Sequence, residues 1–451
     1  MPGNGASRVD RLCLALTGQD ALVVYHQLQA IYFNLVTWLL VVLGVRQASN
    51  FLVPTAAVLP PTDESDAAVA TLVLSPGGLE RLSLEKLGSN VATVGYNVTE
   101  CTRVPGCNSL ARIDDGPLPD GLAIVRITSC SVNYADITIR WGLYESAIRY
   151  VGYPICPGFD FAGIVERVGR NAGVKVGDDV FGITFFGAYS SRLLVPGSQL
   201  RPRPQKALSP DEAAALPSVA GTALHSLKLA GFWPAPPVTN NRAVLIHSAA
   251  GGVGSMLVQM AKILGCSPVV AVVGSSHKVS ACEALGADIV IDKSKLDSDG
   301  LWAAAAAAAP DGYAAIFDAN GVATLRESYD HLAQTGTLVI YGFHTNLPSA
   351  ASLSPLAWAR MAVGMAKMPK FDPMDLVISS KTVAGFNLSF FAEEKALVSA
   401  YMDAIVGWVA AGKLRVAKVT AYPLSEVPKA HTFIQSGASV GKLVLNPPSR
   451  S

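Results

Sequence analysis

The segment Ala249–Gly254 has the residue types that a diphosphate-binding loop needs. It reads Ala-Ala-Gly-Gly-Val-Gly, follows the apolar run Ala243–Ser248 and precedes a helix predicted for Ser255–Leu264. A strand that turns into a helix N-terminus presents free backbone N–H groups and the positive end of the helix dipole to an anion. Gly251 would let the backbone approach the phosphates, and Gly254 would let the helix pack closely on the strand. The pattern predicts a dinucleotide site with contacts from Ala250, Gly251, Gly252, Val253 and Gly254.

This motif departs from the usual fingerprint at its first position, where alanine replaces the first glycine of G-x-G-x-x-G. Glycine-rich turns also occur in many loops that bind nothing, so the hexapeptide alone is weak evidence. The strand–turn–helix context is what favours a cofactor site.

The residues after the second strand of this unit indicate which nicotinamide nucleotide binds. In NAD sites an acidic residue there accepts a hydrogen bond from the ribose 2'-hydroxyl. Gly274 occupies this place, and Ser275, Ser276 and Lys278 follow it. Hydroxyl donors and a fixed positive charge suit a 2'-phosphate, so NADPH is favoured over NADH. The alternative is that the serines only cap the next helix and that Lys278 is a solvated surface lysine.

The elements that must position these residues show two different patterns of predicted secondary structure along the chain. Residues 69–195 are rich in short strands and turns, including strands predicted for Ala70–Leu74 and Leu79–Leu84. From Leu208 onward helices and strands alternate, which is typical of a parallel sheet with crossover helices. Six strands are predicted for that sheet: Ala243–Ser248, Pro268–Val273, Ile289–Ile291, Tyr313–Asp318, Thr337–Tyr341 and Thr382–Phe386.

Residues 1–68 differ from the rest of the chain. The stretch Ala21–Val45 contains no charged residue and is long enough to cross a bilayer as a helix. Polar residues such as Gln27 and Asn34 interrupt it, so a helix on a membrane surface or one packed on the protein itself are equal alternatives. Proline and acidic residues between Pro54 and Asp66 then indicate a linker.

The composition limits the function classes. With 451 residues the chain is long enough for two domains and an extension. Lysine plus arginine is 35 against 34 for aspartate plus glutamate, so nucleic acid is not an expected partner. The seven cysteines form no C-x-x-C pair, which favours reduced thiols in a cytosol-like compartment. Two glycosylation-type triplets, Asn97–Thr99 and Asn387–Ser389, arise easily by chance and receive no weight.

Several further motifs resemble the quinone oxidoreductase branch of the medium-chain dehydrogenase/reductase superfamily, and within it the vesicle amine transport protein family. The resemblance runs from about Val69 to Pro447, and several motifs in the right order are more specific than any one. It implies an α/β fold: a GroES-like β domain (69–213 and 389–451), a Rossmann doubly wound parallel sheet (214–388) and an N-terminal hydrophobic helical extension (1–68). The motifs that carry it are Asn133–Asp136, Gly142–Tyr144, Pro157–Gly163, Val168–Gly169, Gly177–Asp178, Val180–Gly182, Ala213–Pro217, Val383–Leu388 and Val440–Leu445.

The resemblance implies a zinc-independent, NADPH-dependent reductase of quinones or α,β-unsaturated carbonyls. Hydride transfer to such a substrate develops negative charge on its oxygen, which then needs a hydrogen-bond donor. Tyr144 is the first candidate donor, Tyr134 the second, and Asn133 would orient the substrate or the nicotinamide. The simpler alternatives are a half-buried aromatic for Tyr144 and a helix cap for Asn133 and Asp136. Further cofactor contacts are expected by family position from Thr222, Gly342, Phe386 and Lys442.

The chain also departs from its relatives. Zinc alcohol dehydrogenases carry a cysteine ligand where this chain has Asn133 and a Gly-His-Glu where it has Gly158–Asp160, so no metal is expected. His225, His247 and His431 lack metal-ligand spacing and are expected to be packed or capping residues. Residues 88–113 are predicted to be an insertion into the first β region.

Two rival functions and several partner questions stay open. The chain could be a membrane-associated interaction protein that binds a nucleotide without turnover, or an accessory subunit of a membrane complex. A cytoplasmic location and a membrane association through residues 21–45 on the cytosolic face are both open. By analogy with the family, a homodimer through the edge of the sixth strand is a further hypothesis. The substrate itself cannot be named from the sequence.

Overall fold

The structure is a computed structural model, and it describes residues 67–95, 98, 101–235, 242–346, 361, 363–364, 366–391 and 394–448. The apolar stretch at residues 21–45 lies outside these ranges. Within them, no helix is both long and apolar enough to cross a membrane.

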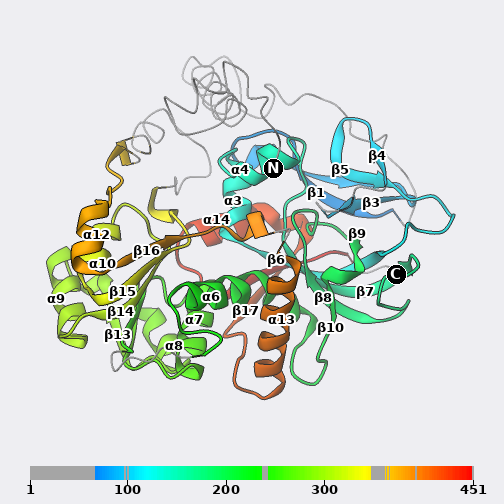
Figure 1. Ribbon diagram of the computed structural model, residues 1–451. Helices are drawn as coiled ribbons and strands as arrows, with labels where there is room; N and C mark the ends of the chain where they lie inside the picture. Colours follow the sequence, from blue (N-terminus) through cyan, green and yellow to red (C-terminus); the bar gives the residue numbers. More distant parts are fainter. Residues whose placement is uncertain are drawn as a thin grey trace, which may run out of the picture.

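A sheet of ten strands forms the β-rich part of the molecule (Figure 1). Its centre is the long strand β6, which pairs with three neighbours, β7, β9 and β18. Apolar residues of these strands pack into two buried cores, because successive side chains point to opposite faces: Ala123 and Val125 of β6 lie in one core, and Leu122 and Ile124 lie in the other. The strands are β3 (Val91–Val94), β4 (Thr102–Val104), β5 (Cys107–Arg112), β6 (Leu122–Val132), β7 (Asp160–Val168), β8 (Asp179–Ile183), β9 (Arg192–Pro196), β10 (Leu200–Pro202), β17 (Val419–Pro423) and β18 (Lys442–Asn446).

The β1–β2 hairpin stands beside this sheet as a separate two-stranded unit. β1 (Val69–Val73) pairs with β2 (Leu82–Lys86) in antiparallel register. The strand predicted for Leu79–Leu84 is wrong at its start, since Leu79–Arg81 forms the 3-10 helix η2. The backbone N–H of Arg81 donates to the carbonyl of Gly78, so the chain is still turning at Leu79–Arg81 before β2 begins.

The segment predicted to be an insertion, residues 88–113, contributes three strands to the ten-stranded sheet. β3 pairs in parallel with β9 and in antiparallel register with β5, and β5 pairs with β4. The segment therefore extends the sheet, and its being an insertion relative to the family stays a prediction.

The second sheet has six strands in the order β13-β12-β11-β14-β15-β16, all parallel. Each of the six predicted strands is confirmed. Val244 and Ile246 of β11 face one core and Leu245 faces the other, which explains the continuous apolar run: both faces of the strand are buried. The strands are β11 (Val244–Ile246), β12 (Val269–Val273), β13 (Ile289–Asp292), β14 (Tyr313–Asp318), β15 (Leu332–Ile340) and β16 (Thr382–Gly385).

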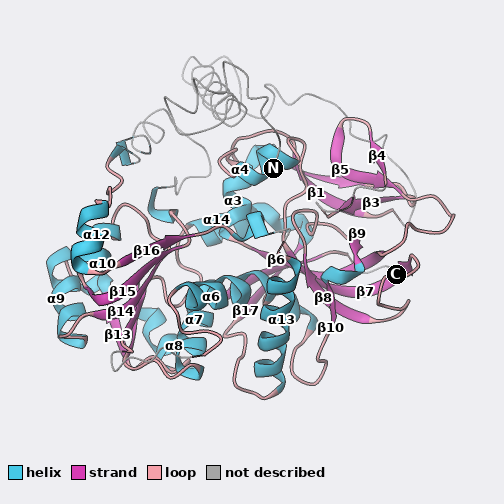
Figure 2. Cartoon of the chain, viewed as in Figure 1, coloured by secondary structure: helices cyan, strands magenta, loops and turns pink. Residues whose placement is uncertain are grey.

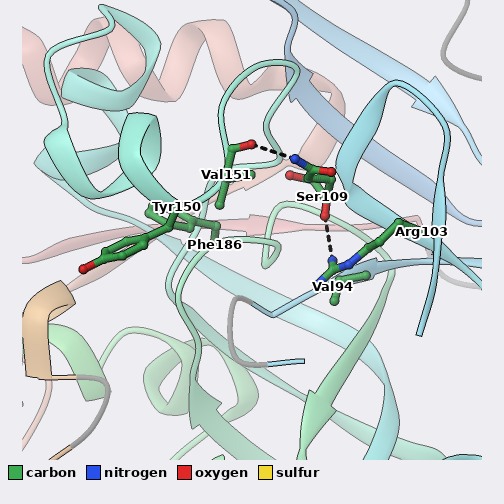
Figure 3. A pocket seen from close by; sticks show the side chains of 7 residues that line it. Val94, Arg103, Ser109, Tyr150, Val151 and Phe186 are labelled. Atoms are coloured by element: carbon green, nitrogen blue, oxygen red, sulfur yellow. Dashed lines mark hydrogen bonds between the residues drawn. The ribbon is translucent and has the colours of Figure 1, made fainter. Parts of the chain in front are cut away.

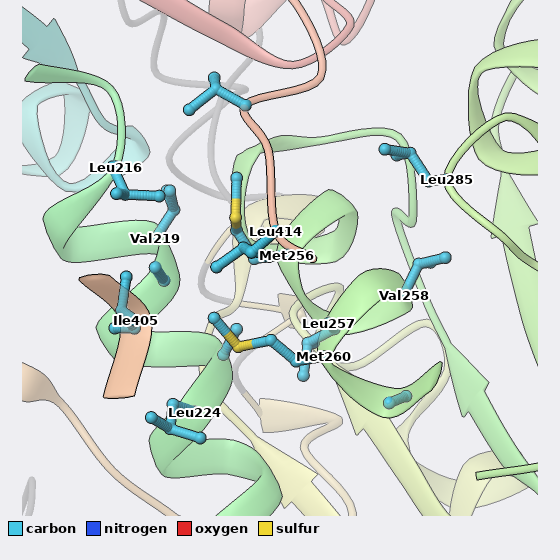
Figure 4. Packing of buried hydrophobic residues seen from close by; sticks show 14 of the residues in the cluster. Leu216, Val219, Leu224, Met256, Leu257, Val258, Met260, Leu285, Ile405 and Leu414 are labelled. Atoms are coloured by element: carbon cyan, nitrogen blue, oxygen red, sulfur yellow. The ribbon is translucent and has the colours of Figure 1, made fainter. Parts of the chain in front are cut away.

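Helices cover both faces of the parallel sheet (Figure 2). On one face α6, α7 and α13 interlock through side chains such as Val219, Met260 and Ile405 (Figure 4). The longer helices are α3 (Tyr134–Arg140), α4 (Glu145–Tyr150), α5 (Pro210–Ala214), α6 (Pro217–Leu229), α7 (Gly252–Ile263), α8 (Val279–Glu283), α9 (Ser298–Ala308), α10 (Leu325–Asp330), α12 (Pro373–Ser379), α13 (Lys395–Ala410) and α14 (Val427–Gln435).

The two architectures share the C-terminal part of the chain. β17 and β18 join the ten-stranded sheet, whereas α13 packs on α6 of the parallel-sheet part. The division at residues 213/214 and 388/389 stays a prediction.

Candidate active site

The carboxyl ends of the parallel strands bring most of the predicted cofactor residues to one edge. The Ala249–Gly254 loop follows β11, Gly274 follows β12, Gly342 follows β15 and Phe386 follows β16. The strand order reverses between β11 and β14, and ligands of such sheets bind outside the carboxyl ends at this reversal. Residues that are up to 137 positions apart, from Ala249 to Phe386, thus follow strands of one sheet and lie along its carboxyl edge.

The glycine loop has the close packing that a diphosphate cradle requires. A Cβ on Gly254 would lie 2.4 Å from the Ser248 carbonyl oxygen and 2.6 Å from the Ala249 Cα, so only glycine fits there. Gly251 is the N-cap of α7, whose first-turn N–H groups have no acceptor within the helix and are the kind of donors that bind an anion. The loop therefore fits the diphosphate of a dinucleotide.

The turn after β12 differs from the sequence expectation in how its side chains are engaged. The Ser276 hydroxyl donates to Asp292 (2.5 Å), and the Lys278 ammonium donates to the Gly437 carbonyl (2.5 Å). Lys278 is only 9% exposed, and burial lowers its pKa. The alternative that Lys278 is a solvated surface lysine is wrong. Ser275 is the N-cap of the 3-10 helix η4 (Ser276–Lys278), without a side-chain capping bond.

Asn133 lies in a buried polar network. It is the N-cap of α3, and its backbone N–H donates to Asp136 (2.8 Å), so the capping alternative is confirmed. Its amide nitrogen donates to Asp160 (2.8 Å), and its amide oxygen accepts from the ammonium of Lys442 (2.7 Å). Lys442 also donates to the Val132 carbonyl (2.9 Å), and burial lowers its pKa.

Lys442 links this network to the glycine loop. Its Cδ would be 2.9 Å from a Cβ at Gly252, the first residue of α7. The preceding residue, Gly441, donates its N–H to the Ala250 carbonyl (2.9 Å). The ammonium predicted to contact the cofactor thus points to Asn133, while its aliphatic stem lies against the loop.

Asp136 is the second carboxylate of the network. It is fully buried and accepts from the Gly158 N–H (2.9 Å) and the Tyr189 hydroxyl (3.1 Å). Burial outweighs these bonds and raises the pKa of Asp136 to about 7. Tyr189 in turn contacts His431 (3.2 Å), which is buried as expected for a packed histidine.

Tyr144 is oriented by hydrogen bonds from a distant segment. Its hydroxyl donates to the amide oxygen of Asn387 (3.1 Å) and is 2.7 Å from the Ser389 hydroxyl. The ring packs edge-on against Phe159 and Phe186. Burial raises the pKa of Tyr144, so the phenol keeps its proton at neutral pH. The discounted triplet Asn387–Ser389 therefore supplies both partners, and no local signal in the sequence indicated this.

Tyr134 meets His344, a residue that the sequence analysis missed. Tyr134 begins α3, and its ring lies 5.8 Å from the imidazole that follows β15. The His344 Nε2 is 3.4 Å from the Ser248 hydroxyl, which donates to Asn320 (3.0 Å). Ser248 and Asn320 follow β11 and β14, so the strand order could have indicated this cluster at the reversal point.

The remaining predicted residues have clear places. Thr222 lies in α6, and its carbonyl accepts from Ser226 (2.8 Å). Phe386 packs edge-on against His225 (4.4 Å), and His225 bonds the Tyr401 hydroxyl (2.7 Å). A Cβ on Gly342 would be 3.2 Å from the Ala319 carbonyl oxygen. His247 is buried against Ser328, so the expectation of packed histidines is confirmed for all three.

Among the described residues, no three His, Cys, Asp or Glu side chains are grouped so that they could hold a metal ion.

A small cavity of about 120 Å³ lies between α4 and the β4–β5 hairpin, with Arg103, Ser109 and Phe186 in its wall (Figure 3). Phe186 thus connects this cavity to the aromatic cluster around Tyr144.

Two protein families match parts of this chain. An alcohol dehydrogenase GroES-like domain family matches residues 119–205, and a zinc-binding dehydrogenase family matches residues 252–403. A probable quinone oxidoreductase of Schizosaccharomyces pombe is 30% identical over 73% of this chain and 89% of its own length. A synaptic vesicle membrane protein VAT-1 homolog of Danio rerio is 28% identical over 73% of this chain. The alignment spans only 64% of that zebrafish protein.

A solved structure, that of mycobacterial Rv1454c complexed with NADPH, is similar over 84% of this chain and 100% of its own. The TM-score is 0.64 and the sequence identity is 25%. On these grounds the chain belongs to the quinone oxidoreductase branch of the medium-chain dehydrogenase/reductase superfamily.

Proposed function

We propose that the protein is an NADPH-dependent oxidoreductase that reduces quinones or α,β-unsaturated carbonyls without a metal. The observation that carries this proposal is the arrangement of residues at the carboxyl edge of the parallel sheet. A glycine cradle at the strand reversal lies beside a buried polar network that contains Asn133. The names of the fission yeast and mycobacterial relatives support the substrate class and the cofactor.

The described residues have separate tasks in this proposal. Bound NADPH supplies a hydride to an electron-poor carbon, so negative charge develops on the substrate oxygen. Tyr144 donates a hydrogen bond to that oxygen by turning its single phenol proton away from the Asn387 amide oxygen, while its own oxygen accepts from the Ser389 hydroxyl. Asn387 and Ser389 hold the phenol in place, and the Lys442–Asn133 bond fixes the amide that orients the nicotinamide or substrate.

The test uses the purified full-length chain. We expect NADPH oxidation with some members of a quinone and enone panel, and calorimetric binding of NADPH. Tyr144→Phe should lower kcat by about 10–100-fold, because one donor to a developing oxyanion is lost, and leave NADPH binding unchanged. If neither NADPH nor NADH binds to the protein, the proposal is overturned.

A second candidate function is a nucleotide-binding interaction protein at a membrane. It is favoured by the hydroxyl of Tyr144, which is already bonded to two side chains, and by the vesicle-protein name of the zebrafish relative. Nucleotide binding without turnover on any panel member would support it. Cell fractionation with and without residues 1–68 tests the proposed membrane association.

A further inference from the structure

The cavity between α4 and the β4–β5 hairpin combines a polar wall with an apolar one. Arg103 and Ser109 form the polar wall, and Val94, Val151 and Phe186 form the apolar wall (Figure 3). A protein cavity of roughly 150 Å³ can hold a benzene molecule, and this cavity, at about 120 Å³, is only slightly smaller. It therefore has room for a short organic group.

Arg103 is the positively charged residue in the polar wall. Its guanidinium donates to the carbonyls of Asn108 (2.6 Å) and Val98 (2.5 Å), which hold it on the hairpin. Within the part of the chain that the structure describes, no carboxylate forms an ion pair with Arg103. A guanidinium has more N–H groups than these two bonds use, and its planar shape suits a carboxylate.

Ser109 supplies a second donor to the same space. It is 2% exposed, and its hydroxyl oxygen accepts from the backbone N–H of Cys156 (3.0 Å). The hydroxyl can therefore donate its own proton to a ligand. One guanidinium and one neutral donor compensate a single negative charge, whereas the second charge of a phosphate would be left without a partner.

Phe186 forms the wall between this cavity and Tyr144. Its ring is 2% exposed and packs edge-on against the Tyr144 ring, with 6.4 Å between the ring centroids. The Phe186 backbone has a φ of 70°, and the Thr184 hydroxyl donates to its carbonyl (3.2 Å). Positive φ is uncommon for a bulky residue, and such strained residues cluster at ligand sites. A group bound in the cavity would thus touch the ring that packs on the proposed hydrogen-bond donor.

We propose that this cavity binds a carboxylate with a short apolar chain, whose oxygens accept from the Arg103 guanidinium and the Ser109 hydroxyl. The carboxylate belongs either to a separate small acid or to the end of a reducible substrate, because the same chemistry recognises both. Both donors lie in residues 88–113, the segment predicted to be an insertion. Binding itself needs no dinucleotide, whereas its effect on reduction rests on the proposed function.

The first experiment measures binding of propionate to the full-length protein by saturation-transfer NMR. A ligand this small should bind with a Kd on the order of 1 mM. Propionamide has the same shape without the charge and should not compete. Arg103→Gln should raise the Kd for propionate at least about 10-fold, because the charge-assisted bonds are lost.

The matched control is Arg112→Gln, which removes the same charge from an exposed position in β5 that does not line the cavity. Its Kd should stay within about twofold of the unmodified protein. Val151→Phe fills the cavity from its apolar wall while the two Arg103 bonds stay in place, and it should abolish propionate binding. A cavity that holds only water would give no propionate signal. That result, equal binding of propionamide or an unchanged Kd in both cavity variants would overturn the inference.

Reduction assays distinguish the two sources of the carboxylate. If it is the end of the substrate, Arg103→Gln should lower kcat/KM about 10-fold for enones that carry a carboxylate and leave neutral enones unchanged. If it is a separate acid, propionate should change kcat for a neutral enone, and Arg103→Gln should remove that effect. Both results support the site. Propionate binding without turnover of any enone would contradict the proposed function alone, since the NMR measurement does not depend on it.

Discussion

At the residue scale, the most consequential groups are buried charges that compensate one another. Lys442, Asp160 and Asp136 are all less than 5% exposed, and Asn133 joins the lysine to the first carboxylate. A buried charge is tolerated only when it has partners of opposite charge or hydrogen-bond partners. Removing one member of the network therefore leaves the others buried without compensation. The network thus couples the stability of the protein to the orientation of Asn133.

Lys442→Met tests this coupling. The substitution leaves Asn133 and the two carboxylates without their cation, so we expect the free energy of unfolding to fall by about 3–5 kcal/mol. Urea denaturation measures the change. Lys413→Met, at an exposed position, is the control and should change stability by less than about 0.5 kcal/mol. Equal effects of both substitutions would contradict the role of the network.

The pKa of Asp136 predicts a pH dependence. Its folded-state pKa, about 7, lies above the ordinary value of 3.8. The folded state thus binds this proton more tightly than the unfolded state does. The resulting contribution of Asp136 to the free energy of unfolding is fully present below about pH 4 and is lost as the pH rises to about 7. Asp136→Asn should therefore be more destabilising at pH 5 than at pH 8, by roughly 2–4 kcal/mol in urea titrations. A pH-independent difference would show that Asp136 titrates normally.

At the element scale, the strand–loop–helix unit β11–α7 is built around one glycine. The Ser248 carbonyl and the Ala249 backbone approach Gly254 so closely that any side chain must displace the helix from the strand. This approach places the first turn of α7 at the carboxyl edge of the sheet.

Gly254→Ala should therefore abolish NADPH binding in calorimetry and lower the unfolding temperature. The control is Gly407→Ala in α13, where a Cβ meets no atom within 4 Å. Alanine is the better helix former, so this control should stabilise the protein by about 0.5–1 kcal/mol and leave binding unchanged. Retained binding in Gly254→Ala would show that the cradle tolerates a wider loop.

At the scale of the whole molecule, the edge of the parallel sheet is the feature that bears on assembly. β16 is the last strand in the described sheet, and α12 precedes it with three exposed apolar residues. Met374, Val377 and Ile378 are 64%, 73% and 76% exposed. Exposed apolar residues grouped on one short helix favour association.

The homodimer hypothesis is thus tested at α12. Sedimentation of the unmodified protein should give twice the chain mass of 47.1 kDa. The double substitution Val377→Glu with Ile378→Glu should shift it to the monomer, because two buried charges would face their copies across the interface. A monomer before substitution would refute the hypothesis.

The sequence by itself determined the features that depend on neighbouring residues. Short local patterns predict the glycine loop, the six parallel strands and the absence of an acidic residue at Gly274. A buried strand and a helix N-terminus can each be recognised from about ten neighbouring residues. The family resemblance then supplied Tyr144 and Asn133 as candidates.

Only the tertiary structure decided which distant side chains meet. Asn133 and Lys442 are 309 residues apart, and Tyr144 and Ser389 are 245 apart. No local pattern encodes such contacts, because they arise when chain segments cross in space. For the same reason the sequence could not indicate that the Lys278 ammonium donates to the Gly437 carbonyl, 159 residues away, and its contact with a 2'-phosphate stays a prediction.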